Sequence, residues 1–223
     1  MSEKVSQMDF ERARYIMVEQ QVRPWNVLDQ RVLDVMLTVP REAFVPERYR
    51  NLACADVRIP IGHGQTTMTP NVEGRLLQAM DIRDTDSVLE VGTGSGYLCA
   101  CLARLAHQVH SVDIVPSFVE RAGVILADWG IANAALFCGD AARDWGDRRF
   151  DVIVLTGALY QLFDSWRLRL AIGGRLFAIV GQPPAMEALR VVRSDEDAFE
   201  AESLFETDID YLQGGEPPRA FQF

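Results

Sequence analysis

The chain has 223 residues, of which 48% are hydrophobic, and it carries a formal net charge of −10. This length suits one large α/β domain with at most a small appendage. The acidic balance argues against a nucleic-acid partner, because phosphate backbones select basic surfaces. A polar start and the lack of an apolar run of bilayer length predict a cytoplasmic protein without a membrane partner. Monomer and homodimer both stay open.

Two helices are predicted near the start of the chain. Apolar and charged residues alternate at helical spacing over 8–22 and 27–39, and Arg23-Pro24-Trp25-Asn26 separates the two segments. An irregular stretch rich in Gly, Thr and Pro follows. A further helix is expected to begin at Pro70 or the next residue and to end near Met80.

From Ser87 onward the pattern alternates between strand and helix. Such alternation implies parallel strands with helices on both faces of the sheet. The tail is expected to add two more strands, as a hairpin at the sheet edge, over 186–194 and 201–211. The other predicted strands are 87–91, 109–113, 134–138, 150–155 and 175–180, and the predicted helices are 97–107, 116–129 and 164–170.

The run from Val88 to Tyr97 holds a glycine-dense turn between a strand and a helix. Glycines permit a tight turn and a close approach of the backbone to a ligand. The N–H groups at the start of the next helix favour a negative or strongly polar ligand group. A structural turn without a ligand is the alternative. The candidate cofactor-binding residues in this run are Glu90, Gly92, Thr93, Gly94, Ser95 and Gly96.

Acidic residues near the ends of the next two strands support a nucleotide site. Asp113 follows the first glycine by about 20 residues, where dinucleotide folds place a carboxylate on the ribose hydroxyls. Asp140, beyond the strand 134–138, is in position to reach an adenine amino group. Each Asp alone is also explained as a loop residue or a helix cap. Together they favour a ligand at one rim of the sheet, and their neighbours Ile114 and Ala141 complete the candidate site.

No metal site is predicted, because the four cysteines lack the spacing of metal ligands. Reduced, buried thiols are the expectation for a cytoplasmic protein. Arg41, Arg48 and Arg50 are mixed with acidic residues and are expected to be solvated. The cysteines are Cys54, Cys99, Cys101 and Cys138.

The glycine run and three earlier segments resemble one enzyme family. Glu90 followed by G-x-G-x-G is similar to motif I of the S-adenosylmethionine (SAM) methyltransferases. With the earlier segments, the chain from about residue 10 to about 182 resembles the protein-L-isoaspartate O-methyltransferase family. Those segments read Met17-Val18-Glu19-Gln20-Gln21-Val22-Arg23-Pro24, Val39-Pro40-Arg41-Glu42-Ala43-Phe44-Val45-Pro46 and Ile59-Pro60-Ile61-Gly62-His63-Gly64-Gln65-Thr66.

The resemblance implies an α/β, Rossmann-like SAM-dependent methyltransferase fold. A central, mostly parallel seven-stranded sheet would carry helices on both faces and an N-terminal helical extension. Residues 1–80 would supply helices and a substrate loop, and 81–223 a SAM-binding domain with a C-terminal β-hairpin, all in one compact unit. The implied reaction moves a methyl group from SAM to an isoaspartyl carboxylate of a peptide or protein. A nicotinamide-dependent oxidoreductase is disfavoured, because its glycine motif has a wider spacing.

The substrate loop departs from the family at one position. The resemblance implies an Ile-Ser pair after Gly64-Gln65-Thr66, with the serine facing the substrate carboxylate. Here the chain continues Thr67-Met68-Thr69, so Met68 replaces that serine. Methionine cannot donate a strong hydrogen bond to a carboxylate. A SAM-binding relative with a different acceptor, or a non-catalytic sensor or interaction protein, is therefore the alternative.

The candidate catalytic residues lie in and before this loop: Thr67, Met68, Thr69 and Asp56. Asp56 matches an acidic position that precedes the family's Pro-Ile-Gly element. No general base is required for carboxyl methylation, because a carboxylate with a pKa of about 4 is already ionised near neutral pH. His63 is either a base for another nucleophile or, more simply, a loop residue bonded locally.

Overall fold

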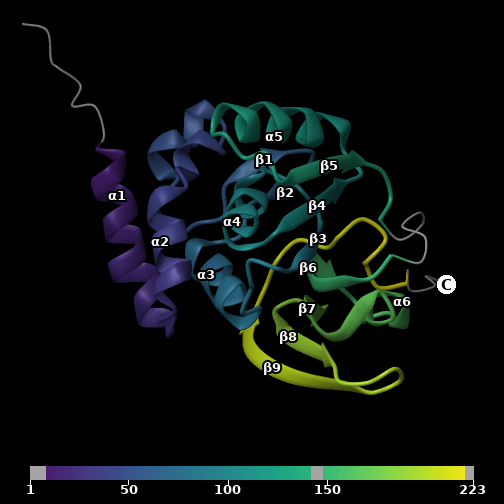
Figure 1. The fold of residues 1–223 in the computed structure, drawn as a ribbon. Helices are drawn as coiled ribbons and strands as arrows, with labels where there is room; N and C mark the ends of the chain where they lie inside the picture. The colour runs from purple at the N-terminus through teal and green to yellow at the C-terminus, as the bar shows by residue number, and fades with distance from the viewer. Residues whose placement is uncertain (1–8, 142–147, 219–223) are drawn as a thin grey trace, which may run out of the picture. The chain divides into compact units, whose positions relative to one another are not determined.

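The computed structural model describes residues 9–141 and 148–218 (Figure 1). The chain divides into two compact units, Met1–Gln78 and Ala79–Phe223. Within the described ranges, no helix is both long and apolar enough to cross a membrane.

The first unit starts with two helices, as predicted over 8–22 and 27–39. Asp9 and Asp29 cap them, since each carboxylate accepts a backbone N–H of the first turn. The first helix is not α-helical to its predicted end. It widens to a π-helical stretch and then tightens to a 3₁₀ turn at Pro24. The bounds are α1 Phe10–Met17, the π-helical stretch Val18–Val22, the 3₁₀ turn Arg23–Trp25 and α2 Gln30–Thr38.

The segment predicted to be irregular contains only short elements before the next α-helix. A two-stranded antiparallel hairpin lies in it, and its turn carries His63 with a φ of 52° between Gly62 and Gly64. The third helix begins at Pro70, as predicted, and the Thr69 carbonyl accepts a hydrogen bond from within its first turn. The bounds are the 3₁₀ turns Arg41–Ala43 and Glu47–Leu52, β1 Pro60–Gly62, β2 Gln65–Thr66 and α3 Pro70–Ala79.

The second unit is built on one seven-stranded sheet with the order β5-β4-β3-β6-β7-β8-β9. The first five strands in this order run parallel, and β8 and β9 continue the sheet antiparallel. The predicted mostly parallel sheet and C-terminal hairpin are confirmed. The bounds are β3 Ser87–Val91, β4 Gln108–Asp113, β5 Ala134–Cys138, β6 Phe150–Leu159, β7 Leu170–Gln182, β8 Ala185–Arg193 and β9 Phe199–Thr207.

Helices lie on both faces of this sheet. The helices after β3 and β4 share one face, because crossovers between parallel strands are right-handed. The helix between β6 and β7 leads in the opposite direction across the sheet and so lies on the other face. The bounds are α4 Tyr97–Leu105, α5 Pro116–Asp128 and α6 Asp164–Arg167.

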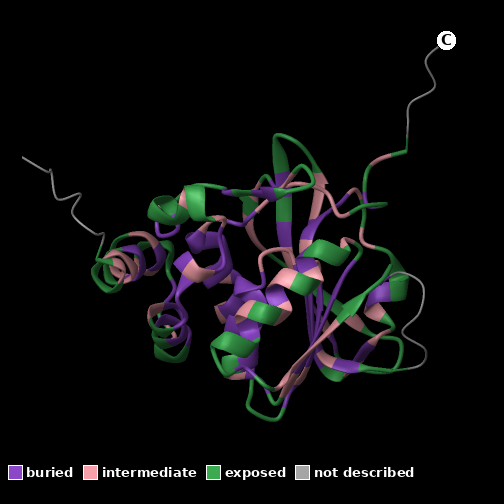
Figure 2. Cartoon of the chain, turned by 90° about the horizontal axis from the view of Figure 1, so that it is seen from above, coloured by how far each residue is buried: buried purple, intermediate pink, exposed green. Residues whose placement is uncertain are grey.

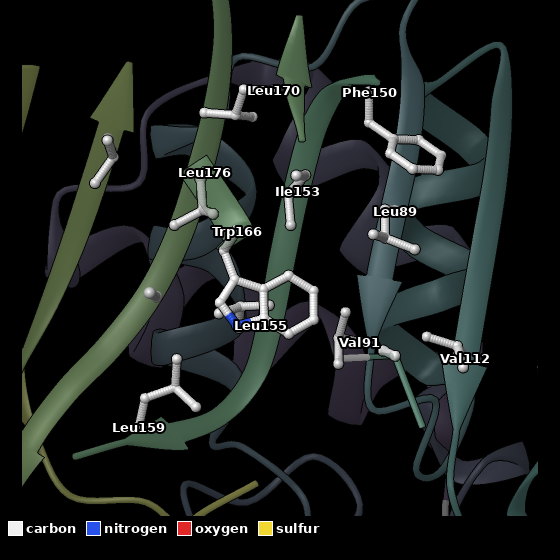
Figure 3. Close-up of a cluster of buried hydrophobic side chains, with 13 residues drawn as sticks. Leu89, Val91, Val112, Phe150, Ile153, Leu155, Leu159, Trp166, Leu170 and Leu176 are labelled. Atoms are coloured by element: carbon white, nitrogen blue, oxygen red, sulfur yellow. The ribbon is translucent and has the colours of Figure 1, made fainter. Parts of the chain in front are cut away.

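The face that carries α6 holds a cluster of buried apolar side chains from five strands (Figure 3). Trp166 of α6 is 6% exposed and lies beside Ile153 and Leu155 of β6 (Figure 3). Leu212, from the chain after β9, packs against the same cluster. The central strands β3, β4 and β6 are mostly buried, whereas the edge strands β5 and β9 are intermediate or exposed (Figure 2). Burial of each large apolar side chain contributes about 1.5–3 kcal/mol to the free energy of folding, so this cluster stabilises the sheet.

Several predicted boundaries are wrong. The strand predicted over 150–155 extends to Leu159, and the strand predicted over 175–180 spans Leu170–Gln182. The helix expected over 164–170 ends at Arg167, because Leu170 already pairs with Phe150 as the first residue of β7. The last strand ends at Thr207 rather than 211, because the chain leaves the sheet edge there.

After β9, a tail formed by residues 208–216 runs beside the end of β6. The Ala158 N–H donates to the Asp210 carbonyl, and the Ala158 carbonyl accepts the Leu212 N–H, both at 2.9 Å. Gly157 permits this approach, since a Cβ there would lie 2.9 Å from the Leu212 nitrogen. The residues after Thr207 therefore pair with the end of β6 instead of continuing β9. Sequence periodicity does not reveal this pairing.

Candidate cofactor site and acceptor loop

The glycine run predicted to bind a ligand forms the turn between β3 and α4. Gly92, Gly94 and Gly96 have φ values of 99°, 52° and 87°, a left-handed backbone that glycine adopts without strain. The Gly92 N–H donates to the Val112 carbonyl, and the Gly96 N–H to the Thr93 carbonyl, each at 2.8 Å. The turn lies where the strand order switches sides, which is where open α/β sheets bind ligands.

Thr156 of β6 holds the glycine turn from the other side. Its hydroxyl reaches the carbonyls of Val91 and Gly92, at 2.9 and 2.8 Å. A Cβ added to Gly92 would lie 2.1 Å from the Thr156 Oγ1, so no larger residue fits there. Sequence analysis did not identify Thr156 as a site residue. The available signal was a hydroxyl residue directly after the apolar run of β6.

Asp113 ends β4 beside this turn and is 8% exposed. Its Oδ2 accepts the Gly94 N–H at 2.8 Å, and its Oδ1 accepts the Val115 N–H at 2.9 Å. Each carboxylate oxygen keeps a second lone pair. Asp113 therefore orders the turn and still has acceptor capacity for the two hydroxyls of a ribose.

Replacing Asp113 is expected to weaken cofactor binding. Asp113→Ala removes the acceptors of two backbone N–H groups and of the ribose, and hydrogen bonds to a charged group are worth about 1.5–3 kcal/mol each. Isothermal titration calorimetry should give a Kd for SAM about 10–100-fold higher than that of the unaltered chain. Asp128→Ala removes the same charge from an exposed position at the end of α5 and should leave the Kd unchanged. Equal Kd values for the two variants would contradict this role.

The predicted adenine side lies at the end of β5. The Gly139 N–H donates to the Asp113 carbonyl at 2.9 Å, which holds the ends of β4 and β5 side by side. Asp140 is exposed, and Ile114 is 44% exposed. Ala141 is 6% exposed and belongs to the buried cluster of Figure 3. Asp140 and Ile114 are therefore open to a ligand, whereas Ala141 acts through packing.

Glu90 lies beneath the glycine turn and is 0% exposed. Its Oε2 accepts a hydrogen bond from the Ser111 hydroxyl, and the Ser111 Oγ lies 2.6 Å from the Thr93 Oγ1. Burial raises the pKa of the Glu90 carboxyl to about 8. In this arrangement Glu90 supports the turn from inside the sheet.

The predicted acceptor-loop residues separate into two groups. Thr67 is paired with Ile59, since its N–H donates to the Ile59 carbonyl at 2.9 Å and its hydroxyl accepts the Ile59 N–H at 3.1 Å. Thr69 and Asp56 are linked through Asn71 instead. The Thr69 hydroxyl donates to the Asn71 side-chain oxygen, and the Asn71 amide donates to the Asp56 carboxylate at 3.5 Å. The structure thus joins Asp56 to Thr69 and gives Thr67 a structural pairing.

Met68 is 8% exposed, and a buried arginine holds its backbone. The Arg41 guanidinium donates to the Met68 carbonyl at 2.7 Å, to the Ala53 carbonyl at 2.6 Å and to the Glu73 carboxylate at 3.0 Å. Arg41 is 1% exposed, so the prediction that it is solvated is wrong. Its charge is balanced by Glu73 on α3, a partner 32 residues away that local composition does not reveal.

Of the four cysteines, Cys54, Cys99 and Cys101 are buried, as predicted, but Cys138 is exposed. Cys138 is the last residue of β5, an edge strand, so that prediction is wrong for this residue.

Comparison with known proteins identifies the family. The family model described as protein-L-isoaspartate(D-aspartate) O-methyltransferase (PCMT) matches residues 13–211. The chain belongs to the PCMT family. The protein-L-isoaspartate O-methyltransferase 1 of Rhodopseudomonas palustris is 38% identical over 209 residues, which cover 93% of this chain and 85% of that protein. The protein-L-isoaspartate O-methyltransferase of Anaeromyxobacter dehalogenans is 42% identical over 177 residues, covering 78% and 85%.

Solved structures agree on the fold. A crystal structure from Plasmodium falciparum, described as a β-aspartate methyltransferase (PCMT) in complex with S-adenosyl-L-homocysteine, superposes with a TM-score of 0.76. The overlap covers 92% of this chain and 99% of that chain, at 17% identity. The predicted Rossmann-like methyltransferase fold and the family resemblance are confirmed. The roles of individual residues in this PCMT family member stay predictions.

Proposed function

We propose that this PCMT family member is a SAM-dependent O-methyltransferase that methylates isoaspartyl carboxylates in peptides or proteins. The observation that carries the proposal is the family match over residues 13–211, which includes both the acceptor loop and the glycine turn. Relatives bearing this activity in their names are 38–42% identical to the chain over most of its length.

The residues at the glycine turn fit SAM. Gly92, Gly94 and Gly96 hold the turn in a left-handed backbone without Cβ atoms, which is the build expected of a turn that a ligand approaches closely. The start of α4 offers N–H groups to a negative group, and Asp113 offers two acceptors to a ribose. A polar, partly anionic nucleoside therefore matches the donors and acceptors present.

The reaction requires few catalytic groups from the chain. SAM supplies a methyl group on a positively charged sulfur. An isoaspartyl carboxylate with a pKa of about 4 is already ionised near neutral pH, so no side chain has to remove a proton. Catalysis then rests on holding the carboxylate in line and excluding water. We assign that task to the acceptor loop, with Thr69 and Asp56 linked through Asn71.

The nature of the partner follows from charge and thiol chemistry. A net charge of −10 supports a peptide or protein substrate rather than a nucleic acid. Three buried cysteines support a reducing, cytoplasmic location. We infer that the chain acts as a monomer or a homodimer.

The proposal is tested with methyl-labelled SAM and two peptides that differ only in an aspartyl or isoaspartyl linkage. Base-labile label is expected on the isoaspartyl peptide alone. Asp113→Ala should lower the initial rate at subsaturating SAM, whereas Asp128→Ala should not. Equal labelling of both peptides, or none at saturating SAM, would overturn the assignment.

Restoring the serine is expected to raise activity. Met68→Ser supplies a hydroxyl donor where the family resemblance puts one against the substrate carboxylate, and one well-placed donor is worth about 10²–10³ in rate. Because the loop is fitted to methionine, we expect a smaller gain, about tenfold in kcat/KM for the isoaspartyl peptide. Met68→Leu keeps an apolar side chain and should match the unaltered chain. A Met68→Ser rate at or below that of Met68→Leu, with both variants folded, would show that position 68 does not face the acceptor.

A further inference from the structure

A chain of three side chains links the interior of the sheet to the glycine turn. Glu90 on β3 and Ser111 on β4 are register partners, and both are 0% exposed. The Ser111 hydroxyl reaches the Glu90 Oε2, and the Ser111 Oγ lies 2.6 Å from the hydroxyl oxygen of Thr93, which is 3% exposed. Thr93 belongs to the turn itself, so one intervening hydroxyl connects Glu90 to the turn.

The surroundings of Glu90 disfavour a negative charge. The Glu90 Oε1 is buried without a nitrogen or oxygen partner within the described residues. Burial raises the pKa of Glu90 by more than hydrogen bonds from Ser111 and Cys99 lower it. Burial also keeps the Cys99 thiol protonated by raising its pKa. Asp113 acts on Glu90 from the end of β4 with a like charge, and the register partner on β6 is the apolar Val154. The buried Glu90 carboxyl therefore favours its neutral form.

The proton on Glu90 sets the direction of the hydrogen-bond chain. A hydroxyl has one hydrogen to donate. With Glu90 ionised, Ser111 donates to Glu90 and Thr93 donates to Ser111. With Glu90 protonated on Oε2, Glu90 donates to Ser111, Ser111 donates to Thr93, and the hydrogen of the Thr93 hydroxyl is released. The ionised form also puts a negative charge close to the start of α4, whose first-turn N–H groups suit a negative ligand group.

We propose that Glu90 is a positioning residue that must hold its proton for the glycine turn to bind the cofactor. The inference rests on the proposed function only in naming SAM as that cofactor. The Glu90 carboxyl is 0% exposed beneath the turn, so we assign it an effect through the turn rather than through direct contact with the ligand.

The sign of the pH dependence follows from the raised pKa. Folded Glu90 keeps its proton through neutral pH and loses it as the pH rises through about 8, whereas an ordinary glutamate has a pKa of 4.5. If only the protonated form binds, the apparent Kd scales inversely with the protonated fraction, which gives about a tenfold rise between pH 7 and pH 9. Binding is therefore expected to be tightest below pH 7 and to weaken above pH 8.

The experiment measures the Kd of S-adenosylhomocysteine, which binds without turnover, by calorimetry from pH 6.5 to 9 on the full chain. Glu90→Gln keeps the shape and stays neutral, so it should match the unaltered chain at pH 7 and bind about tenfold tighter at pH 9. Dividing the Kd of the unaltered chain by that of Glu90→Gln at each pH removes the effect of ligand protonation, because both proteins bind the same ligand. Asp113→Asn keeps Glu90 but removes the like charge, so the rise in Kd should move to lower pH.

A constant Kd ratio between pH 7 and 9 would overturn the inference while leaving the proposed function intact. No binding by either protein at any pH would overturn both. If Glu90→Gln fails to fold, carbon-13 NMR of the glutamate-labelled, unaltered chain decides the matter. One glutamate carboxyl titrating between pH 7 and 9 is expected, and its absence would refute a protonated Glu90.

Discussion

Gly92→Ala is expected to raise the Kd for SAM by about 100-fold. The added Cβ would lie 2.1 Å from the Thr156 Oγ1, in a backbone with a φ of 99°. Steric overlap costs about 1–3 kcal/mol and a left-handed alanine about 1–2 kcal/mol more. The turn relieves this strain by shifting away from its binding conformation. Returning to that conformation costs free energy, and this cost weakens binding. Calorimetric titration of the variant measures it directly.

Two further variants isolate the cause. Thr156→Ala in the Gly92→Ala background removes the overlapping oxygen and should recover part of the affinity, but not the part due to φ. Gly123→Ala adds the same methyl group on α5, where the nearest atom is a Leu136 carbon at 3.6 Å. That helical change should leave binding unaltered and stabilise the fold by about 0.5–1 kcal/mol. If Gly92→Ala has the affinity and stability of the unaltered chain, the close approach of Gly92 to the Thr156 side chain is refuted.

Arg41→Met is expected to lower the free energy of unfolding by about 3–5 kcal/mol, because it strands a buried carboxylate. Arg41 and Glu73 have side chains that are 1% and 5% exposed. The change also leaves the carbonyls of Ala53 and Met68 without the guanidinium that they accept from. Since Met68 lies in the acceptor loop, methyl transfer to a peptide should fall together with stability. Urea denaturation and initial rates measure the two effects.

The matched control is Arg23→Met, which breaks the exposed pair between Arg23 and Glu19. Those side chains are 38% and 32% exposed, so the expected cost is below about 1 kcal/mol. Adding Glu73→Leu to Arg41→Met removes the stranded carboxylate and should recover part of the stability. If Arg41→Met costs no more than Arg23→Met, the buried pair does not anchor the acceptor loop.

The central fold was predictable because its local signals agree with one another. Each parallel strand is a short apolar run, and each helix between them has a different periodicity, so the alternation from Ser87 implies the sheet. The boundaries near Arg167 and Thr207 were not predictable in this way. They depend on which strand Leu170 and the tail meet, and that choice is made by tertiary pairing with β6.

A site residue was predictable where its role follows from its position at a turn or at the end of a strand. The glycines of the turn and Asp113 at a strand end have such positions, and the structure brings them together. Thr156 and Ser111 escaped notice because their roles depend on which strands lie next to β3. Arg41 was misread for the same reason, since its partner Glu73 lies on another element. Contacts between strands and helices distant in sequence leave no local pattern.

Methylation of the α-carboxylate of an isoaspartyl residue by this PCMT family member is tested by tandem mass spectrometry of a peptide incubated with the chain and SAM. Fragmentation of the peptide locates the added methyl group. We expect one methyl group on the isoaspartyl carboxyl, and none on the aspartyl form of the same peptide. A methyl group on any other side chain, or on both forms alike, would contradict it.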